Sequence, residues 1–301
     1  MNISPIALFV YNRLEHTRKV IDALLKNELA AQSHIYIFSD APASEKHREQ
    51  VDRVRGYIKK IAGFKGVEII EQSVNKGLSA SIIEGVTGIL ASNERVIVLE
   101  DDLVTSPYFL RYMNRALELY ENEERVISVH AYIYPVKEKL PETFFLRGAD
   151  CWGWGTWRRG WKFFEPDGRR LLSELNSRKL TSRFDFNNSY PYTKMLKEQI
   201  KGKNNSWAIR WYASAFLHDK LTLYPGRSLV NNIGIDNSGT HCANNSENFE
   251  VFLSATPVDL KKLPCEENED AFKVFEKYFE SNKKPLILRA VNFLKRAILK
   301  K

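Results

Sequence analysis

The sequence has few cysteines and no long apolar run. Only three of its 301 residues are cysteines, Cys151, Cys242 and Cys265, and their separations match neither a zinc site nor a disulfide framework. Such usage is typical of a reducing cytoplasm. No run of apolar residues is long enough to predict a membrane-spanning helix. The stretch 1–13 lacks the basic segment and cleavage site of a signal peptide, and we interpret it as leading into a first strand.

The composition is that of a globular protein with an excess of positive charge. Hydrophobic residues make up 44% and charged residues 27% of the chain, which excludes a disordered protein. The length allows one large domain or two small ones. The net charge of +8 favours nucleic acid, an anionic membrane surface or phosphate-bearing ligands as partners. No nucleic-acid-binding motif, internal repeat or low-complexity segment is present, so we expect no nucleic acid partner.

Apolar segments alternate with amphipathic segments along the first hundred residues. Continuous apolar runs predict buried strands over 6–10, 34–39, 67–70 and 95–99. Apolar residues spaced by three and four predict helices over 14–25, 44–61 and 78–90. This alternation predicts an α/β fold whose mostly parallel sheet is covered on both faces.

Polar residues follow each of the four predicted strands. They are Tyr11-Asn12-Arg13, Asp40-Ala41-Pro42, Asn75-Lys76-Gly77 and Glu100-Asp101-Asp102. In open sheets of this kind, ligands bind beyond the carboxyl ends of the strands. The sequence therefore predicts a nucleotide-sized polar site at one edge of the sheet.

The three consecutive acids Glu100, Asp101 and Asp102 stand out within this edge. Adjacent carboxylates repel one another, and ionised carboxylates are costly at the end of a buried strand. Mg²⁺ or Mn²⁺ would remove that cost by taking carboxylate oxygens and sharing its other positions with phosphate. The alternative is an acidic turn before the helix that Ser106-Pro107 begins, because acids are favoured near a helix N-terminus.

The segment from Phe144 to Trp161 contains four of the six tryptophans, interrupted by glycines. This pattern predicts a loop-rich aromatic surface and not a regular helix. Aromatic faces bind the apolar faces of sugar rings, although tryptophan also fills cores. We expect at least one of these tryptophans to serve as a sugar platform.

Two later segments suggest contacts with ligands or membranes. The loop within Ser228–Cys242 is rich in Gly, Asn and Ser, and such a loop can close over a ligand and offer N–H groups to phosphate. An ordinary surface turn is the alternative. The segment Lys283–Lys301 predicts a basic amphipathic helix, which is typical of binding to an anionic membrane surface. Docking on its own domain and an oligomer contact are the alternatives.

The motif Val98-Leu99-Glu100-Asp101-Asp102-Leu103, followed by a helix near Pro107-Tyr108-Phe109, resembles the metal-binding signature of GT-A glycosyltransferases. It is most similar to N-acetylglucosaminyltransferase I-like enzymes of family 13, and also to bacterial sugar transferases near family 2. The resemblance spans roughly 3–242 and includes Gly153-Trp154-Gly155 and Asn231–His241. It implies a nucleotide-sugar-binding half over 1–130 and an acceptor-binding half over 131–262. The segment 263–301 would be a C-terminal helical tail.

The resemblance implies a nucleotide-sugar donor, a Mn²⁺ or Mg²⁺ ion and a hydroxyl acceptor, and it favours UDP. The expected donor contacts are Tyr11, Asn12 and Arg13 on the nucleotide, Asp40 on its base or ribose, Lys76 and Gly77 in the same pocket, and Glu100 on the sugar. Asp102 would bind the metal, Asp101 the ribose or the metal, and His241 a metal or phosphate. The metal would stabilise the departing diphosphate.

The acceptor side departs from the family pattern. Inverting members use a carboxylate base, which in family 13 follows a tryptophan at a helix start. The matching position after Trp207 is Ala208. The base is therefore open between Asp150 and Asp236, each of which is alternatively a cap or turn residue, and a retaining mechanism needs none. The expected acceptor platform comprises Trp152, Trp154, Trp157, Trp207 and Arg210.

From these interpretations we predict a metal-dependent glycosyltransferase that extends a glycan or lipid-linked acceptor in bacterial surface polysaccharide synthesis. It would be cytoplasmic and peripheral on the inner face of the membrane. A non-catalytic carbohydrate-binding protein using the Trp-rich loop is the main alternative. A sugar-nucleotide pyrophosphorylase would need a glycine-rich loop after the first strand, and Tyr11–Leu14 has no glycine. A nucleic-acid binder is opposed by the acidic triplet.

Overall fold

The computed structural model describes residues 2–236 and 249–283. His241 and nearly all of the predicted basic helix at Lys283–Lys301 lie outside the described residues.

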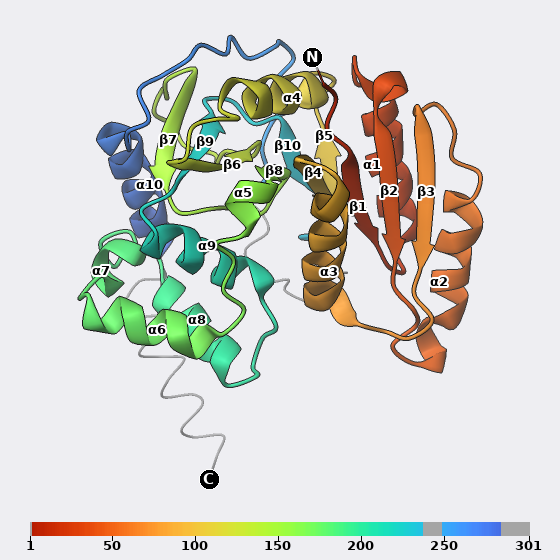
Figure 1. Ribbon diagram of the computed structural model, residues 1–301, viewed down its shortest axis with the longest axis horizontal. Helices are drawn as coiled ribbons and strands as arrows, with labels where there is room; N and C mark the ends of the chain where they lie inside the picture. Colours follow the sequence, from red (N-terminus) through yellow and green to blue (C-terminus); the bar gives the residue numbers. More distant parts are fainter. Residues whose placement is uncertain (1, 237–248, 284–301) are drawn as a thin grey trace.

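An eight-stranded sheet runs through the molecule in the order β3-β2-β1-β4-β8-β6-β9-β7 (Figure 1). Its strands are β1 (Ile6–Val10), β2 (His34–Ser39), β3 (Gly66–Glu71), β4 (Arg95–Glu100), β6 (Val126–His130), β7 (Thr143–Arg147), β8 (Trp154–Trp157) and β9 (Leu221–Pro225). Neighbouring strands pair in parallel except where β8 meets β4 and β6 and where β7 meets β9. The predicted α/β class with a mostly parallel sheet is confirmed.

Helices cover both faces of the first half of this sheet. They are α1 (Leu14–Leu25), α2 (Glu45–Ile58) and α3 (Gly77–Ser92), and the short 3₁₀ helix η1 (Ala30–Gln32) follows α1. Alternate side chains of β1 point to opposite faces, so Leu8 joins the apolar cluster that contains Val20 of α1. Phe9 joins the cluster that contains Val86 of α3. This is the two-sided burial that continuous apolar strands predict, and it gives the Rossmann-like arrangement expected of a GT-A fold.

The second half of the chain adds further helices and a separate apolar cluster. The helices are α4 (Phe109–Leu119), α5 (Arg158–Trp161), α6 (Gly168–Ser177), α7 (Thr181–Phe184), α8 (Tyr192–Ile200), α9 (Trp207–Leu217) and α10 (Glu269–Ser281). Asn268 caps α10 by accepting a 2.8 Å hydrogen bond from the Ala271 N–H. Phe272, Phe275 and Phe279 of α10 are buried in the cluster that also holds Phe144 of β7 and Phe216 of α9. The C-terminal region therefore packs onto the sheet at least as far as α10.

Apart from a loop at 148–153, the Trp-rich segment is regular structure, so the prediction of a loop-rich aromatic surface is largely wrong. Its centre is β8, which lies between β4 and β6. Trp154 joins the cluster on the α3 face and Trp157 the cluster on the α1 face. Trp154, Trp157 and Trp207 are at most 3% exposed. A strand in the middle of a sheet has helices over both faces, so its large side chains fill the core.

A second, two-stranded sheet lies next to the acidic triplet. It pairs β5 (Leu103–Thr105) with β10 (Val230–Asn232) in antiparallel register. Directly after β10, the Ile233 N–H donates a 2.8 Å hydrogen bond to the backbone oxygen of Asp102. This pairing brings the start of the Gly- and Asn-rich loop to the triplet.

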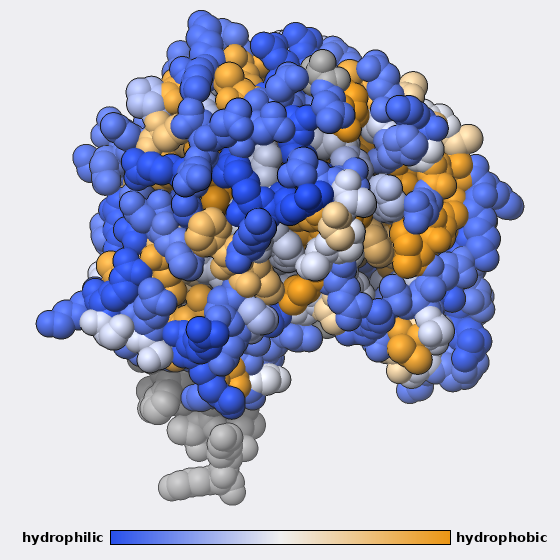
Figure 2. Space-filling model, viewed as in Figure 1, coloured by the Kyte–Doolittle hydropathy of each residue, from blue (hydrophilic) through white to orange (hydrophobic). Residues whose placement is uncertain are grey.

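In the described part of the chain, no helix combines the length and apolar character needed to cross a membrane. Figure 2 shows one face of the molecule, where hydrophilic residues predominate and hydrophobic residues form separate patches.

Candidate functional site

The structure contains the polar edge that the sequence predicts, and the order of the strands determines where it lies. The carboxyl ends of β1, β2 and β3 lie at the same edge, towards the bottom of Figure 1, where α3 also begins. β4 pairs in parallel with β1, so Glu100 at its end lies opposite Phe9 near the end of β1. The turn after β1 and the acidic triplet after β4 are therefore neighbours.

Arg13 forms ion pairs with two acids of the triplet. Its Nη2 atom donates to Oδ1 of Asp101 and, at 2.8 Å, to Oδ2 of Asp102. The three side chains are only 20%, 7% and 15% exposed. A shared guanidinium relieves the repulsion between the two carboxylates. The positive group at this end of the sheet is therefore supplied by the chain itself.

The triplet carries more negative charge than Arg13 neutralises. Burial, together with the charges of Asp102 and Asp101, raises the pKa of Glu100 to about 8. Burial also raises the pKa of Asp101, although the Arg13 charge opposes this. Oδ2 of Asp101 is buried and has no hydrogen-bond partner among the described residues. The site therefore favours binding of an additional cation.

The triplet fits a divalent cation that is shared with a ligand and not one enclosed by protein. Among the described residues, no three His, Cys, Asp or Glu side chains converge as a metal-binding group. Mg²⁺ commonly uses one or two carboxylates and completes its shell with phosphate and water, and Asp101 and Asp102 offer such a pair. The Gly234 backbone also approaches closely, since a Cβ there would lie 2.2 Å from Oδ2 of Asp102.

Asp40 has a structural role that differs from the predicted contact with base or ribose. Its Oδ1 accepts hydrogen bonds from the N–H groups of Ala41 at 2.8 Å and Lys76 at 2.9 Å. Its Oδ2 accepts from the Gly77 N–H at 2.8 Å and from Nδ2 of Asn75 at 3.1 Å. A buried carboxylate thus caps the N-terminus of α3 and ties the end of β2 to it. The Lys76 side chain turns to Glu84 at 2.5 Å.

A cavity of about 230 Å³ lies beside Arg13. It is lined by Asn12, Arg13, Leu14, Glu15, His16, Gln50 and Arg53. Nearby, the hydroxyl of Tyr11 accepts a 2.9 Å hydrogen bond from the Ala43 N–H and lies 3.0 Å from Nδ1 of His47. The structure thus brings the predicted residues Asn12 and Arg13 to one cavity. The sequence analysis did not identify His16, although it lies only three residues after Arg13, in the first turn of α1.

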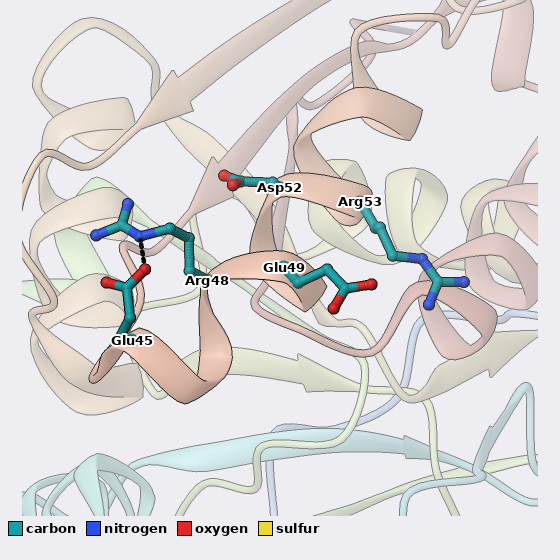
Figure 3. Close-up of a pocket in the computed structure, with 5 residues that line it drawn as sticks. All are labelled: Glu45, Arg48, Glu49, Asp52 and Arg53. Carbon is teal, nitrogen blue, oxygen red and sulfur yellow. Dashed lines mark hydrogen bonds and ion pairs between the residues drawn. The ribbon is translucent and has the colours of Figure 1, made fainter.

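Another hollow lies along α2 and shares Arg53 with the cavity beside Arg13. Figure 3 shows its side chains, Glu45, Arg48, Glu49, Asp52 and Arg53, projecting from this one helix. All five are exposed, and Glu45 and Arg48 pair with each other at 2.7 Å. Charges of both signs on one exposed helix face are ordinary surface, so we assign no site there.

Asp236, one of the two base candidates, forms an ion pair with a helix of the first half. Its Oδ2 lies 3.2 Å from Nε2 of His16, which is also 3.3 Å from the backbone oxygen of Ile233. The loop after β10 thus begins against α1, close to Arg13.

Asp150, the other base candidate, lies near a buried histidine. Its Oδ1 accepts a 2.8 Å hydrogen bond from the Cys151 N–H and lies 3.9 Å from Nε2 of His130. That nitrogen accepts a 3.1 Å hydrogen bond from the Trp152 N–H. Burial lowers the pKa of His130, despite the opposing charge of Asp150.

Asp150 and the acidic triplet are neighbours across Cys151. Burial raises the pKa of Cys151, and the charges of Asp150, Glu100 and Asp102 all raise it further. The charges of the base candidate and of the triplet therefore both act on this one thiol. The carboxylate of Asp150 is partly exposed, at 23%, so it can meet a ligand.

The expected acceptor platform is mostly wrong. Trp154, Trp157 and Trp207 are core residues, and Arg210 is buried with its guanidinium bound to the protein. Its Nη2 donates to Oγ of Ser79 at 2.7 Å, and its Nη1 donates to a backbone oxygen at 3.1 Å. A helix that is buried on all sides gives its arginine internal partners. Trp152 is the one predicted platform residue that remains partly exposed.

No family model matches this chain, and no curated protein does either. Among solved structures, the chain is similar to a mannosyltransferase from Pyrobaculum calidifontis in complex with GDP-Man and Mn²⁺, with 12% identity and a TM-score of 0.32. This match covers 44% of the chain and 36% of that structure. It is similar to TarS of S. aureus, with 13% identity and a TM-score of 0.31, over 48% of the chain and 24% of that structure.

A third solved structure is a UDP-glucose pyrophosphorylase complexed with UDP-glucose. The identity is 16% and the TM-score 0.36, over 74% of the chain and 90% of that structure. The chain thus spans about a third and about a quarter of the lengths of the first two structures. At these scores the likenesses carry no functional argument, so function is argued below from the site.

Proposed function

We propose that this protein is a glycosyltransferase that moves a sugar from a nucleotide-sugar, by resemblance a UDP-sugar, to a hydroxyl of a glycan or lipid-linked acceptor. The observation that carries the proposal is the pairing of Arg13 with Asp101 and Asp102 beside a cavity at the carboxyl ends of the strands. A cation and clustered carboxylates at this edge suit a diphosphate and the metal ion that accompanies it.

The residues of the first half would hold the donor. Arg13 and Asn12 line the cavity, where a guanidinium can bind phosphate oxygens through two donors. Asp101 and Asp102 would hold a Mn²⁺ or Mg²⁺ ion, which when bound offsets the charge that develops on the departing diphosphate. Glu100, next in the triplet, would face the sugar. His16 and residues 233–236, which follow β10, would narrow the entrance to the cavity and exclude water.

We favour Asp150 over Asp236 as the base for an inverting reaction. Asp236 forms an ion pair with His16, whereas the nearest histidine nitrogen to Asp150 is 3.9 Å away and belongs to a ring that burial keeps neutral. The carboxylate of Asp150 is partly exposed, at 23%, so it can meet an acceptor hydroxyl and take its proton. It also lies close enough to the triplet for both to influence Cys151.

A thermal-shift screen tests the donor assignment. UDP, GDP, CMP and dTDP are each added with and without Mn²⁺, to the native chain and to Asp102→Asn. A ligand at about 100 times its Kd stabilises the folded state by roughly 2.7 kcal/mol. We expect one nucleoside diphosphate to raise the melting temperature only with metal, and Asp102→Asn to abolish this effect. The exposed variant Asp52→Asn serves as the matched control and should leave the shift intact.

The opposite outcome has a clear meaning. If no nucleotide shifts the transition with or without Mn²⁺, the triplet is a helix-start feature. The alternative of a non-catalytic carbohydrate-binding protein then gains support.

We further propose that the protein acts at the inner face of a bacterial membrane, in surface polysaccharide synthesis. The support is the basic amphipathic pattern at Lys283–Lys301, which lies almost entirely outside the described residues. Deletion of 284–301 should reduce recovery with vesicles containing anionic lipid and leave nucleotide binding unchanged. Equal recovery of the full and shortened chains would contradict this proposal.

A further inference from the structure

Partly exposed aromatic side chains gather around Asp150. We call them the aromatic cluster: Tyr134, Trp152, Tyr190, Tyr192, Phe249 and Tyr278. Tyr134 follows β6, Trp152 precedes β8, Tyr190 and Tyr192 lie at the start of α8, and Tyr278 belongs to α10. Five segments that are distant in the sequence therefore converge beside one carboxylate.

The rings of the aromatic cluster form a connected array. The ring centroids of Tyr134 and Tyr278 are 5.4 Å apart, and those of Tyr190 and Tyr192 are 4.5 Å apart. The two pairs are linked by the buried Phe279, whose centroid is 4.9 Å from that of Tyr134 and 4.8 Å from that of Tyr190. Trp152 joins this array through Phe249, whose centroid is 5.8 Å from that of Trp152 and 6.3 Å from that of Tyr134. Such contacts fix the orientation of each ring. The array is thus a fixed surface on which a ligand can stack.

Tyrosines predominate among the partly exposed aromatic side chains of this region. Those packed against the neighbouring apolar cluster are Tyr134, Tyr190, Tyr192 and Tyr278, whereas the buried aromatic side chains of that cluster include both phenylalanines and tyrosines. A surface that binds a polyhydroxylated ring uses both ring faces and hydroxyl groups.

The charge of Asp150 reaches these tyrosines. Burial raises the pKa of Tyr134, Tyr190 and Tyr192, and the charge of Asp150 is in each case the next cause. Contacts between side chains link Asp150 to the cluster. Its Oδ1 lies 3.9 Å from Nε2 of His130, whose ring centroid is 6.3 Å from that of Tyr132. The Tyr132 ring is in turn 5.4 Å from Tyr134 and 4.7 Å from Trp152. The pairing of Val98 in β4 with Trp154 in β8 also brings the acidic triplet towards this region, so acidic groups gather here.

We propose that the aromatic cluster is the acceptor subsite, and that it binds a neutral pyranose ring by stacking while Asp150 accepts a hydrogen bond from one of its hydroxyls. This inference rests on the proposed glycosyltransferase function and names its acceptor class. The apolar face of a pyranose matches the rings of Trp152 and the tyrosines. An anionic sugar, such as a uronic acid, is disfavoured because Asp150 and the triplet would repel its carboxylate.

Saturation-transfer NMR with methyl β-glycosides tests the subsite. The probes are the methyl β-pyranosides of glucose, galactose and N-acetylglucosamine, with methyl β-glucuronide as the anionic control. Each is added to the full chain alone and with UDP and Mn²⁺. We expect transfer to at least one neutral glycoside, concentrated on the protons of its apolar face, and at least fivefold weaker binding of the glucuronide.

Variants link the signal to the cluster. Tyr278→Ala and Tyr190→Ala should each weaken binding about threefold to tenfold, as loss of one aromatic contact does. Tyr278→Phe should keep most of the affinity because it keeps the ring. Tyr57→Ala, on the distant helix α2, is the matched control and should not change it. Melting temperatures show which variants fold. Tyr278→Phe remains informative if an alanine variant does not fold.

The inference and the proposed function fail in different ways. If no neutral glycoside gives transfer under either condition, or if the cluster variants behave like Tyr57→Ala, the subsite is overturned while the nucleotide screen still stands. Preferential binding of the glucuronide also overturns it. Nucleotides could fail to bind while neutral glycosides bind and the cluster variants weaken that binding. In that case the cluster is a pyranose-binding site, but it is not the acceptor subsite of a glycosyltransferase.

Discussion

The guanidinium of Arg13 lies 2.8 Å from the carboxylate of Asp102, and the same nitrogen also bonds to Asp101. These carboxylate oxygens are the ones that a divalent cation would use. Two positive groups this close repel each other, so we expect a bound metal ion to compete with Arg13 for these carboxylates and to displace it. The displaced guanidinium is then next to the cavity, where a diphosphate would receive it.

Removal of Arg13 should therefore have opposite effects on metal and on nucleotide. In Arg13→Ala we expect tighter binding of Mn²⁺ in the absence of nucleotide, because no internal cation competes, and weaker binding of a nucleoside diphosphate with metal present. Titration calorimetry measures both affinities, with the exposed Arg48→Ala as control. Weaker Mn²⁺ binding in Arg13→Ala would show that the guanidinium does not compete.

The same variant should be less stable until metal is added. Breaking a buried ion pair leaves uncompensated charge and costs about 3–5 kcal/mol, and the partial exposure of Arg13 places the expected loss at or below the lower end. Mn²⁺ should restore much of the lost free energy of unfolding, measured by denaturant titration. A loss that Mn²⁺ does not reduce would contradict the view that metal and Arg13 substitute for each other.

Asp40→Asn should act mainly on stability. The native carboxylate accepts four hydrogen bonds, three of them from backbone N–H groups, and an amide nitrogen cannot accept any of them. We expect a loss of about 1–3 kcal/mol in the free energy of unfolding, against little change in the exposed control Asp52→Asn. If Asp40→Asn instead weakens nucleotide binding without loss of stability, Asp40 is a ligand contact after all.

Two glycines of α3 provide a matched pair. Gly77 has φ +74° with open space around its would-be Cβ, and Gly88 also has open space but no positive φ. Gly77→Ala should destabilise the protein by about 1–2 kcal/mol because only the backbone conformation is strained. Gly88→Ala should stabilise it by up to about 1 kcal/mol through helix propensity. Denaturant titration gives the free energy of unfolding of both variants. Equal changes in the two would exclude backbone strain at residue 77 as the cause.

His130 should make the protein less stable in mild acid. Burial lowers its pKa in the folded state, so below about pH 6.5 the unfolded chain binds a proton that the folded chain does not. Stability therefore falls as the pH drops through this range, by at most about 1.4 kcal/mol per pH unit for one group. His130→Gln should flatten the dependence between pH 7 and 5, whereas the exposed His218→Gln should not. Parallel slopes in both variants would exclude His130 as the cause.

The first half of the fold could be predicted because its signals are local. Apolar runs and their polar ends gave β1, β2 and β4 and placed Arg13 near the triplet, since parallel strands end at one edge. Asp40 had the right chemistry, but its partners are backbone N–H groups of a turn far along the chain, which no sequence pattern reveals.

The second half depends on distant pairings. β8 has four residues, and both of its neighbours come from other parts of the chain, so its glycines and tryptophans suggested a loop. Tyr134 could have been found, because it follows β6 near its carboxyl end, where the rule that located the triplet also applies. Its pairing with Tyr278 of α10 could not, since it depends on tertiary packing.

The place of β8 between β4 and β6 also has a consequence for biosynthesis. β4 and β6 are both made before β8 and do not pair with each other. Until Trp157 has left the ribosome, each therefore presents an open edge, the usual template for pairing with a foreign strand. A chain cut at residue 130 would keep both edges open permanently. We therefore expect the two halves to fold together and neither to be stable when expressed alone.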